Sequence, residues 1–304
     1  PLKSLQKLIM GETETFNYNA FRQLNDLREL KLSNFQTIEI DKNFFDQHPN
    51  LESLDISQLK SLRRNSSKND KHYIDLKALA NLKSLKSLNL CDNNLNLDED
   101  SKTLFSLENL ESLNLGLTSG YGFEKRKLNV NETFFQRMKH LKYLNLSGNH
   151  IKLEGDCFRH LTQLRELDLS CTLLDSDNND NDIFSSLINL ETIKCFDVEQ
   201  CELFKLYRLS ELVNLKELHT IGIAEHYLDQ FREMLRSKRR PGELQDPNPT
   251  YDDLIYFILR DLTKLKTIQL FHCNLTYINK RVLSQMNEFS VLDLSGNRIR
   301  HIPD

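Results

Sequence analysis

The sequence has no tryptophan and few turn-forming residues, with only 9 Gly and 6 Pro among 304 residues. β-Sandwiches and barrels need many tight turns, so this composition argues against both folds. The formal net charge of −4 argues against general nucleic-acid binding, which requires a strongly basic surface. No run of eighteen apolar residues occurs, so the sequence predicts no membrane-spanning helix.

Leucine and asparagine, in contrast, are abundant and recur in a fixed order. The pattern Leu-x-x-Leu-x-Leu-x-x-Asn-x-Leu has clean copies that begin at Leu85, Leu141 and Phe289. Degenerate copies begin at Leu27, Leu51, Leu110, Leu164, Leu190, Leu215 and Leu265, with a partial copy around Leu5, Leu8 and Met10. The sequence therefore contains about eleven units, most of them spaced by roughly 22 to 26 residues.

A second periodic signal lies upstream of the units. A phenylalanine precedes the next leucine by a short step, as in Phe158-Arg-His-Leu161, at Phe21, Phe45, Phe105, Phe135, Phe158 and Phe184. Alternate leucines of a short strand would point inward, and the phenylalanines would fill the far side of the core. A single coil cannot bury its own apolar side, so stability must come from stacking of neighbouring coils.

These motifs resemble the leucine-rich-repeat family, most closely its phenylalanine-containing class, which is common in Toll-like receptor ectodomains. The resemblance implies an α/β fold: a right-handed solenoid, or horseshoe, with a parallel β-sheet on its concave side. We expect one domain over residues 1–304, a fragment of a longer array, because the family's disulfide-rich end caps are missing. The asparagine ladder should be discontinuous, since its slot holds other residues in seven units: Phe35, Leu59, Thr118, Thr172, Val198, Ile223 and Cys273.

The repeat spacing stretches at three places, which predicts insertions near residues 58–78, 117–131 and 225–261. The last segment reads as two helices, because Leu228, Phe231 and Leu235 recur at helical spacing. Thr250 and Asp253 resemble a capping box at the start of the second helix. Two interpretations stay open: a degenerate repeat with an unusually helical convex side, or a protruding segment that joins a binding surface.

Residues for catalysis or metal binding are hard to find. Gly-x-Ser-x-Gly, His-Glu-x-x-His and Gly-x-x-x-x-Gly-Lys motifs are missing, so the sequence predicts neither an enzyme nor a cofactor. Residues 175–182 faintly resemble a calcium loop, but a solvated acidic loop explains them better. A zinc site could be drawn from Cys195, Cys201, His219 and His226, yet Cys195 falls on an inward leucine slot, which favours a small buried apolar role.

Localisation stays open at this point. No two of the six cysteines form an obvious bridge. Four Asn-x-Ser/Thr sequons, at Asn65, Asn131, Asn145 and Asn274, are about the number expected by chance. The family resemblance slightly favours an extracellular or cell-surface location, with a cytoplasmic location as the alternative.

The outward positions of the strands are the expected binding surface, because curvature gives a solenoid an extended and rigid concave face. In three successive recognisable units, the slot after the third leucine holds a large apolar residue: Phe196, Ile221 and Phe271. Exposing each of these would forgo roughly 1.5 to 3 kcal/mol of burial, so the cluster needs a reason. We expect a partner-binding hot spot formed with Lys194, His219, Gln269 and His272. The competing interpretation is that the segment 225–261 folds over this row and covers it.

Taken together, the sequence predicts non-catalytic recognition of a protein ligand on the concave face by a receptor-like ectodomain fragment. The alternative is an intracellular leucine-rich-repeat adaptor or a microbial effector that binds host proteins.

Overall fold

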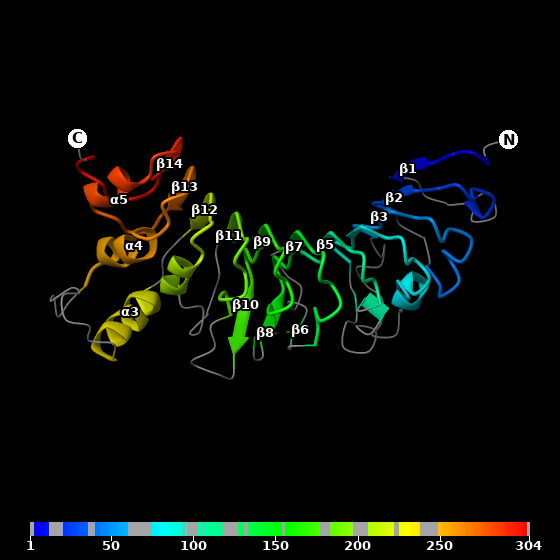
Figure 1. Cartoon of the computed structure of the whole chain (residues 1–304), viewed down its shortest axis with the longest axis horizontal. Coiled ribbons are helices and arrows are strands. Elements are labelled where there is room, and N and C mark those ends of the chain that lie inside the picture. Colours follow the sequence, from blue (N-terminus) through cyan, green and yellow to red (C-terminus); the bar gives the residue numbers. More distant parts are fainter. Residues whose placement is uncertain are drawn as a thin grey trace, which may run out of the picture.

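The structure, a computed structural model, describes most of the chain. The described residues are 3–11, 21–35, 40–59, 74–93, 95, 103–104, 106–117, 127–130, 133–153, 156–176, 183–196, 206–221, 225–237 and 249–302. The chain forms an arch with its two ends at opposite sides, strands along the inner curve and helices along the outer curve (Figure 1).

One parallel sheet of eleven strands lines the inner curve, and the strands follow one another in chain order. Each strand belongs to one repeat, which confirms the expected number of about eleven. The strands are β1 (Lys7–Gly11), β2 (Glu29–Ser33), β3 (Ser53–Asp55), β4 (Ser87–Asn89), β5 (Ser112–Asn114), β7 (Tyr143–Asn145), β9 (Glu166–Asp168), β11 (Thr192–Phe196), β12 (Glu217–Ile221), β13 (Thr267–Phe271) and β14 (Val291–Asp293).

Side-chain alternation builds the core as the pattern predicts. The central leucine of a strand is buried while its two neighbours are partly exposed, as for Leu144 between Tyr143 and Asn145. Phenylalanines close the opposite side of the core, and the rings of Phe135 and Phe158, in consecutive coils, have their centroids 6.0 Å apart. Phe105 lies outside the described residues; Leu104, three residues before Leu107, is fully buried there.

Buried asparagines join neighbouring coils. The side-chain amide of Asn149 donates to the carbonyl of Leu146 in its own coil at 2.7 Å and to that of Leu115 in the preceding coil at 3.1 Å. Asn93 and Asn297 repeat this arrangement. Where threonine occupies the slot, the Thr172 hydroxyl donates only within its own coil, to the Leu169 carbonyl at 2.6 Å. The ladder is therefore discontinuous, as predicted.

The outer side of the arch carries short and varied elements. They are the 3-10 helices η1 (Leu76–Leu79) and η2 (Leu206–Glu211), the α-helices α3 (Glu225–Ser237), α4 (Tyr251–Leu259) and α5 (Lys280–Gln285), and a second parallel sheet of β6 (Lys127–Val130), β8 (His150–Leu153) and β10 (Leu173–Ser176). Most of the expected insertions near 58–78 and 117–131 lies outside the described residues.

The segment 225–261 contains two helices, α3 and α4, as its periodicity predicts. The capping box is present: the Thr250 hydroxyl accepts from the Asp253 backbone N–H, and the Asp253 carboxylate accepts from the Thr250 backbone N–H. β12 pairs directly with β13, so no additional strand enters the sheet in this gap. Helices α3 and α4 therefore both lie in the single repeat between β12 and β13.

Candidate recognition surface

The length of each strand depends on the residue in the middle outward slot of its repeat, which lies between the second and third leucines of the pattern. Where that residue is Asp or Asn, its side-chain oxygen accepts a hydrogen bond from the backbone N–H two residues later, as Asn114 Oδ1 accepts from the Gly116 N–H at 3.0 Å. The same bond occurs at Asp55, Asn89, Asn145, Asp168 and Asp293. This local turn ends the strand at the Asp or Asn, so all six strands are three residues long.

Strands β11, β12 and β13 have Lys194, His219 and Gln269 at that position, and none of these side chains forms the short turn. Each strand runs two residues further and is five residues long. The extension places Phe196, Ile221 and Phe271 opposite one another in the ladder. Three of the predicted binding residues are thus brought into one row; of their side chains, that of Phe271 is described and is half-buried.

A polar row runs beside the apolar one. Lys194, His219 and Gln269 pair in register across the same three strands, and Asp168 on β9 continues the row. The His219 imidazole is held tightly, since its Nδ1 lies 2.5 Å from the Gln269 side-chain oxygen and its Nε2 lies 3.4 Å from Glu217 Oε2. Only 14% of the His219 side chain is exposed.

Two residues of this network were not predicted from the sequence. Glu217 lies on β12 two residues before His219, and its carboxylate also contacts the Thr192 hydroxyl on β11 at 3.5 Å. Both residues occupy the first outward slot of their strands, before the residues of the predicted surface. The chain Thr192–Glu217–His219–Gln269 therefore orders the centre of the surface across three strands.

His272 lies at the border of the surface instead of within the rows. It follows β13 with a left-handed φ of 50° and is exposed. Its backbone N–H donates to the Ser295 carbonyl at 3.0 Å, and its ring lies against Gly296 so closely that a Cβ there would come within 2.3 Å. This surface, with Lys194, Phe196, His219, Ile221, Gln269, Phe271 and His272, is called the β11–β13 surface below.

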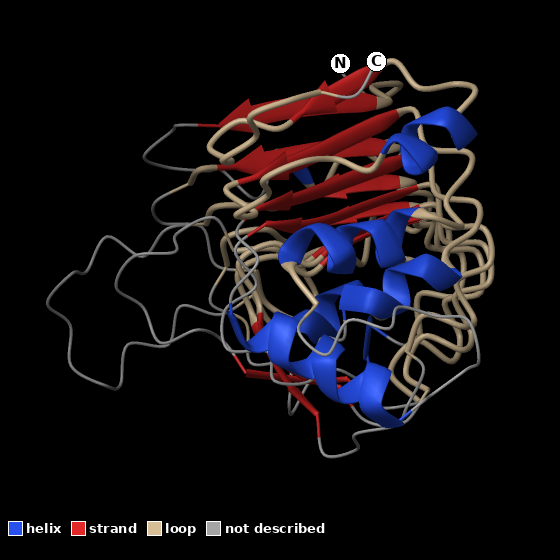
Figure 2. Cartoon of the chain, turned by 90° about the vertical axis from the view of Figure 1, so that its left-hand side faces the viewer, coloured by secondary structure: helices blue, strands red, loops and turns tan. Residues whose placement is uncertain are grey.

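The helices of the segment 225–261 do not cover the β11–β13 surface. Both views place α3 and α4 on the outer side of the arch, away from the inner face of the sheet (Figures 1 and 2). The apolar residues of these helices pack on the outer side: the ring centroids of Phe231 and Phe257 lie 5.4 Å apart, and Leu254 and Ile258 are buried. The interpretation that this segment covers the apolar row is wrong for α3 and α4, while residues 238–248 lie outside the described part of the chain.

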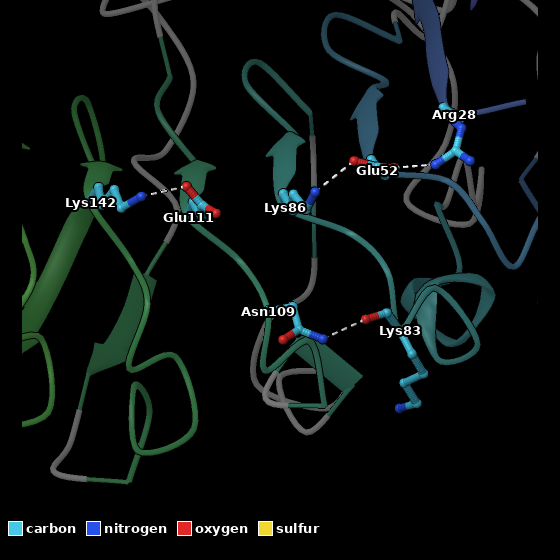
Figure 3. A network of polar contacts seen from close by, with 7 residues as sticks. All are labelled: Arg28, Glu52, Lys83, Lys86, Asn109, Glu111 and Lys142. Carbon is cyan, nitrogen blue, oxygen red and sulfur yellow. Dashed lines mark hydrogen bonds and ion pairs between the residues drawn. The ribbon is translucent and has the colours of Figure 1, made fainter. Parts of the chain in front are cut away.

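Ion pairs run along the edge of the sheet where the strands begin. The Glu52 carboxylate lies between two cations of neighbouring coils, Lys86 at 2.7 Å and Arg28 at 2.5 Å (Figure 3). These contacts, that with Lys86 foremost, hold the pKa of Glu52 below its usual value. Glu191 lies in the same way between Arg165 and Lys216. Because these pairs between adjacent coils are largely exposed to solvent, each should contribute little to stability.

The predicted weak metal sites gain no support. Cys195 is buried, and burial raises the pKa of its thiol to about 12, whereas a zinc ligand must be a thiolate. Cys201, the His226 side chain and residues 177–182 lie outside the description. Within the described part of the chain, no three His, Cys, Asp or Glu residues are grouped to hold a metal ion.

The described cysteines, Cys91, Cys157, Cys171, Cys195 and Cys273, form no disulfides. Of the described sequons, Asn274 is exposed, whereas Asn145 is half-buried at the centre of the concave face. No helix of the described residues is long and apolar enough to cross a membrane.

Two sequence-family models match the chain. A leucine-rich-repeat model matches residues 125–174, and a model of the BspA type leucine-rich repeat region matches residues 2–119. Among curated proteins, transforming growth factor beta activator LRRC33 of Danio rerio is 25% identical over 317 residues. That match covers 96% of this chain, which spans about 42% of the relative's length.

Solved structures show the same fold. A chain in the mouse RP105/MD-1 complex is 21% identical with a TM-score of 0.56, covering 97% of this chain and 47% of the other. A chain in the TLR13–ssRNA13 complex is 22% identical with a TM-score of 0.54, covering 98% and 41%. At such identities the likeness concerns the fold alone. The repeat pattern, the eleven-stranded parallel sheet and the family models agree that the chain belongs to the leucine-rich-repeat family, and its fold is similar to those of the matched chains in the TLR13 and RP105 complexes.

Proposed function

We propose that this chain recognises a protein partner, without catalysis, through the β11–β13 surface of its concave face. In this proposal the apolar row Phe196, Ile221 and Phe271 forms the hot spot. Lys194, His219, Gln269 and His272 form its polar surround. A buried aromatic anchor inside a polar rim is the arrangement that concentrates binding energy at protein interfaces.

One observation carries the proposal: the three strands with large apolar residues after the third leucine are also two residues longer than their neighbours. The extension gives the row a hydrogen-bonded backbone, so its members are held in fixed register. A rigid surface loses little entropy when a partner binds, which favours affinity. The Glu217–His219–Gln269 contacts add to this rigidity.

Three strands in the N-terminal half of the sheet present fewer groups suited to anchoring a partner. The concave positions of β3, β4 and β5 are Ser53, Asp55, Ser87, Asn89, Ser112 and Asn114, which are small and polar. Aromatic residues are enriched and serine is depleted at protein interfaces, so the C-terminal part of the sheet is the better anchor.

We further propose that the chain is part of a receptor-like ectodomain, by analogy with the proteins that it resembles. The second candidate is an intracellular adaptor or a microbial effector with the same binding surface. Intact mass of the protein from its native source separates the two, with thiols alkylated under denaturing conditions. Added glycan mass favours the ectodomain, whereas an unmodified chain with all six thiols reactive favours the intracellular candidate.

Hydrogen–deuterium exchange of the chain, free and bound to its captured partner, tests the location of binding. We expect slower exchange in peptides that contain 192–196, 217–221 and 267–272, with no change in peptides that contain 53–57 and 87–91. Protection confined to the outer helices or to the N-terminal strands would assign the binding to another surface.

A further inference from the structure

One position of the repeat is described in ten units, and nine of them have an apolar side chain there. It lies three residues before the first leucine of the unit, in the turn that leads into the strand. Its occupants are Leu24, Leu82, Leu107, Met138, Leu161, Leu187, Leu212, Leu262 and Met286, all buried. In the remaining unit the position is His48, which is also fully buried.

His48 keeps the backbone of the turn that the leucines form. Its N–H donates to the Phe45 carbonyl, and its own carbonyl accepts from Leu51, as the Leu82 carbonyl accepts from Leu85. His48 therefore differs from the other units in its side chain and not in the backbone of its turn. An ionisable imidazole occupies a buried position that holds a hydrocarbon side chain in the other described units.

The surroundings of the imidazole are aromatic. Its ring stacks on Phe21 with centroids 3.9 Å apart, and Phe44 and Phe45 pack around Phe21. Nε2 lies 3.2 Å from the Phe21 carbonyl oxygen, which can only accept, so Nε2 carries the proton of the neutral ring. Nδ1 is buried and has no hydrogen-bond partner. A second proton, which would go to Nδ1, has no acceptor there.

Within the described part of the chain, no charged group compensates for a proton on this ring: burial and the bond to the Phe21 carbonyl determine its pKa shift. The described ionisable residues on the turns of these coils include Arg22 and Asp26 before it, Asp41, Lys42 and Asp46 on its own coil, and Asp75 and Lys77 on the next coil. All of them are exposed except Asp75, which is half-buried and caps η1. Asp46, the nearest in sequence, accepts instead from the Asn81 side chain at 3.2 Å. Burial accordingly lowers the pKa of His48 from 6.5, and the bond to the Phe21 carbonyl offsets this only in part.

We propose that His48 makes the N-terminal coils of the solenoid acid-sensitive, so that its protonation loosens the packing of Phe21, Phe44 and Phe45 while the remaining coils stay folded. The sign follows from proton balance. The unfolded segment takes up a proton near pH 6.5, the folded one only at lower pH, so stability falls as pH drops between these two values. Repeat arrays can open locally, because each coil contacts only its neighbours.

The test is peptide-resolved hydrogen–deuterium exchange between about pH 7.5 and pH 5.5, with each rate divided by its intrinsic value. His48→Leu restores the residue type that the other coils use, and His140→Gln removes an exposed histidine as the matched control. In the wild type and in His140→Gln, the opening constant of peptides covering 21–51 should rise on acidification, by at most about tenfold per pH unit for one proton. It should stay flat in His48→Leu, and peptides covering 141–170 should not change.

An equal rise in His48→Leu and in the wild type would overturn the proposal, and so would its absence in the wild type. Proton NMR gives an independent check that does not depend on unfolding. The imidazole signal missing from His48→Leu identifies His48, and its titration midpoint should lie below 6.5. A midpoint at or above that value would contradict the mechanism even if the coils loosen in acid.

Discussion

The Asp252 carboxylate on the outer helix α4 accepts from both the backbone N–H of Thr276, at 2.9 Å, and its hydroxyl, at 2.6 Å. A third bond comes from the backbone N–H of Tyr277 at 3.1 Å. The carboxylate is buried, and it joins α4, which lies between β12 and β13 in the chain, to the loop that follows β13 in the next repeat. Helix α4 is therefore integrated into the solenoid.

Replacement of Asp252 by Ala should lower the free energy of unfolding by roughly 2 to 4 kcal/mol, because two backbone N–H groups and a hydroxyl lose their acceptor. Asp252→Asn keeps one carbonyl oxygen and should cost less. The control is Asp229→Ala on α3, which removes a more exposed ion pair with Arg232. It should change stability by less than about 0.5 kcal/mol. Denaturant unfolding measures all three; equal losses for Asp252→Ala and Asp229→Ala would refute this role.

The buried ladder asparagine Asn149 and the strand-end asparagine Asn114 should differ in their contribution to stability. Asn149→Ala removes the side-chain amide that donates to buried carbonyls of two coils and should cost roughly 2 to 3 kcal/mol. Asn114→Ala removes one bond to Gly116 on a half-exposed surface and should cost about 0.5 to 1 kcal/mol. The comparison is made by chemical denaturation of both variants. A reversed order would mean that the turn at the strand end matters more than the ladder between coils.

The described cysteines should separate by reactivity. Burial raises the pKa of the Cys195 thiol to about 12, so at about pH 8 it should resist iodoacetamide for as long as the protein stays folded. Cys171 is exposed and should be alkylated first. Peptide mass spectrometry after timed alkylation gives both rates. Comparable rates for the two in the folded protein would contradict the burial of Cys195.

Much of this structure could be predicted because the same inward positions form the core in every repeat. The inward slots of Leu144 and its equivalents, the number of strands and the register of Lys194, His219 and Gln269 all follow from spacing alone. The capping box of Thr250 and Asp253 is equally local. Such features depend on residues a few positions apart, and the backbone period fixes their geometry.

The remainder depends on contacts that spacing does not determine. The extension of β11 to β13 could have been inferred from the absence of Asp or Asn at the middle outward slot, but only once the turn at Asn114 was known. The contacts of Glu217 with Thr192 and His219 depend on rotamers across strands. The position of α3 and α4 on the outer side depends on the residues against which Phe231 and Phe257 pack, and the helical periodicity does not specify those residues.

The central claim is that the β11–β13 surface binds a protein partner, and the affinity of a double variant tests it most directly. Phe196→Ala with Phe271→Ala should weaken binding of the captured partner by roughly tenfold or more, with little change in the melting temperature. Ile9→Ala provides the control, because Ile9 is an apolar residue on the same sheet face, 61% exposed, at its other end. An unchanged affinity of the double variant, measured beside an unchanged melt, would contradict the account.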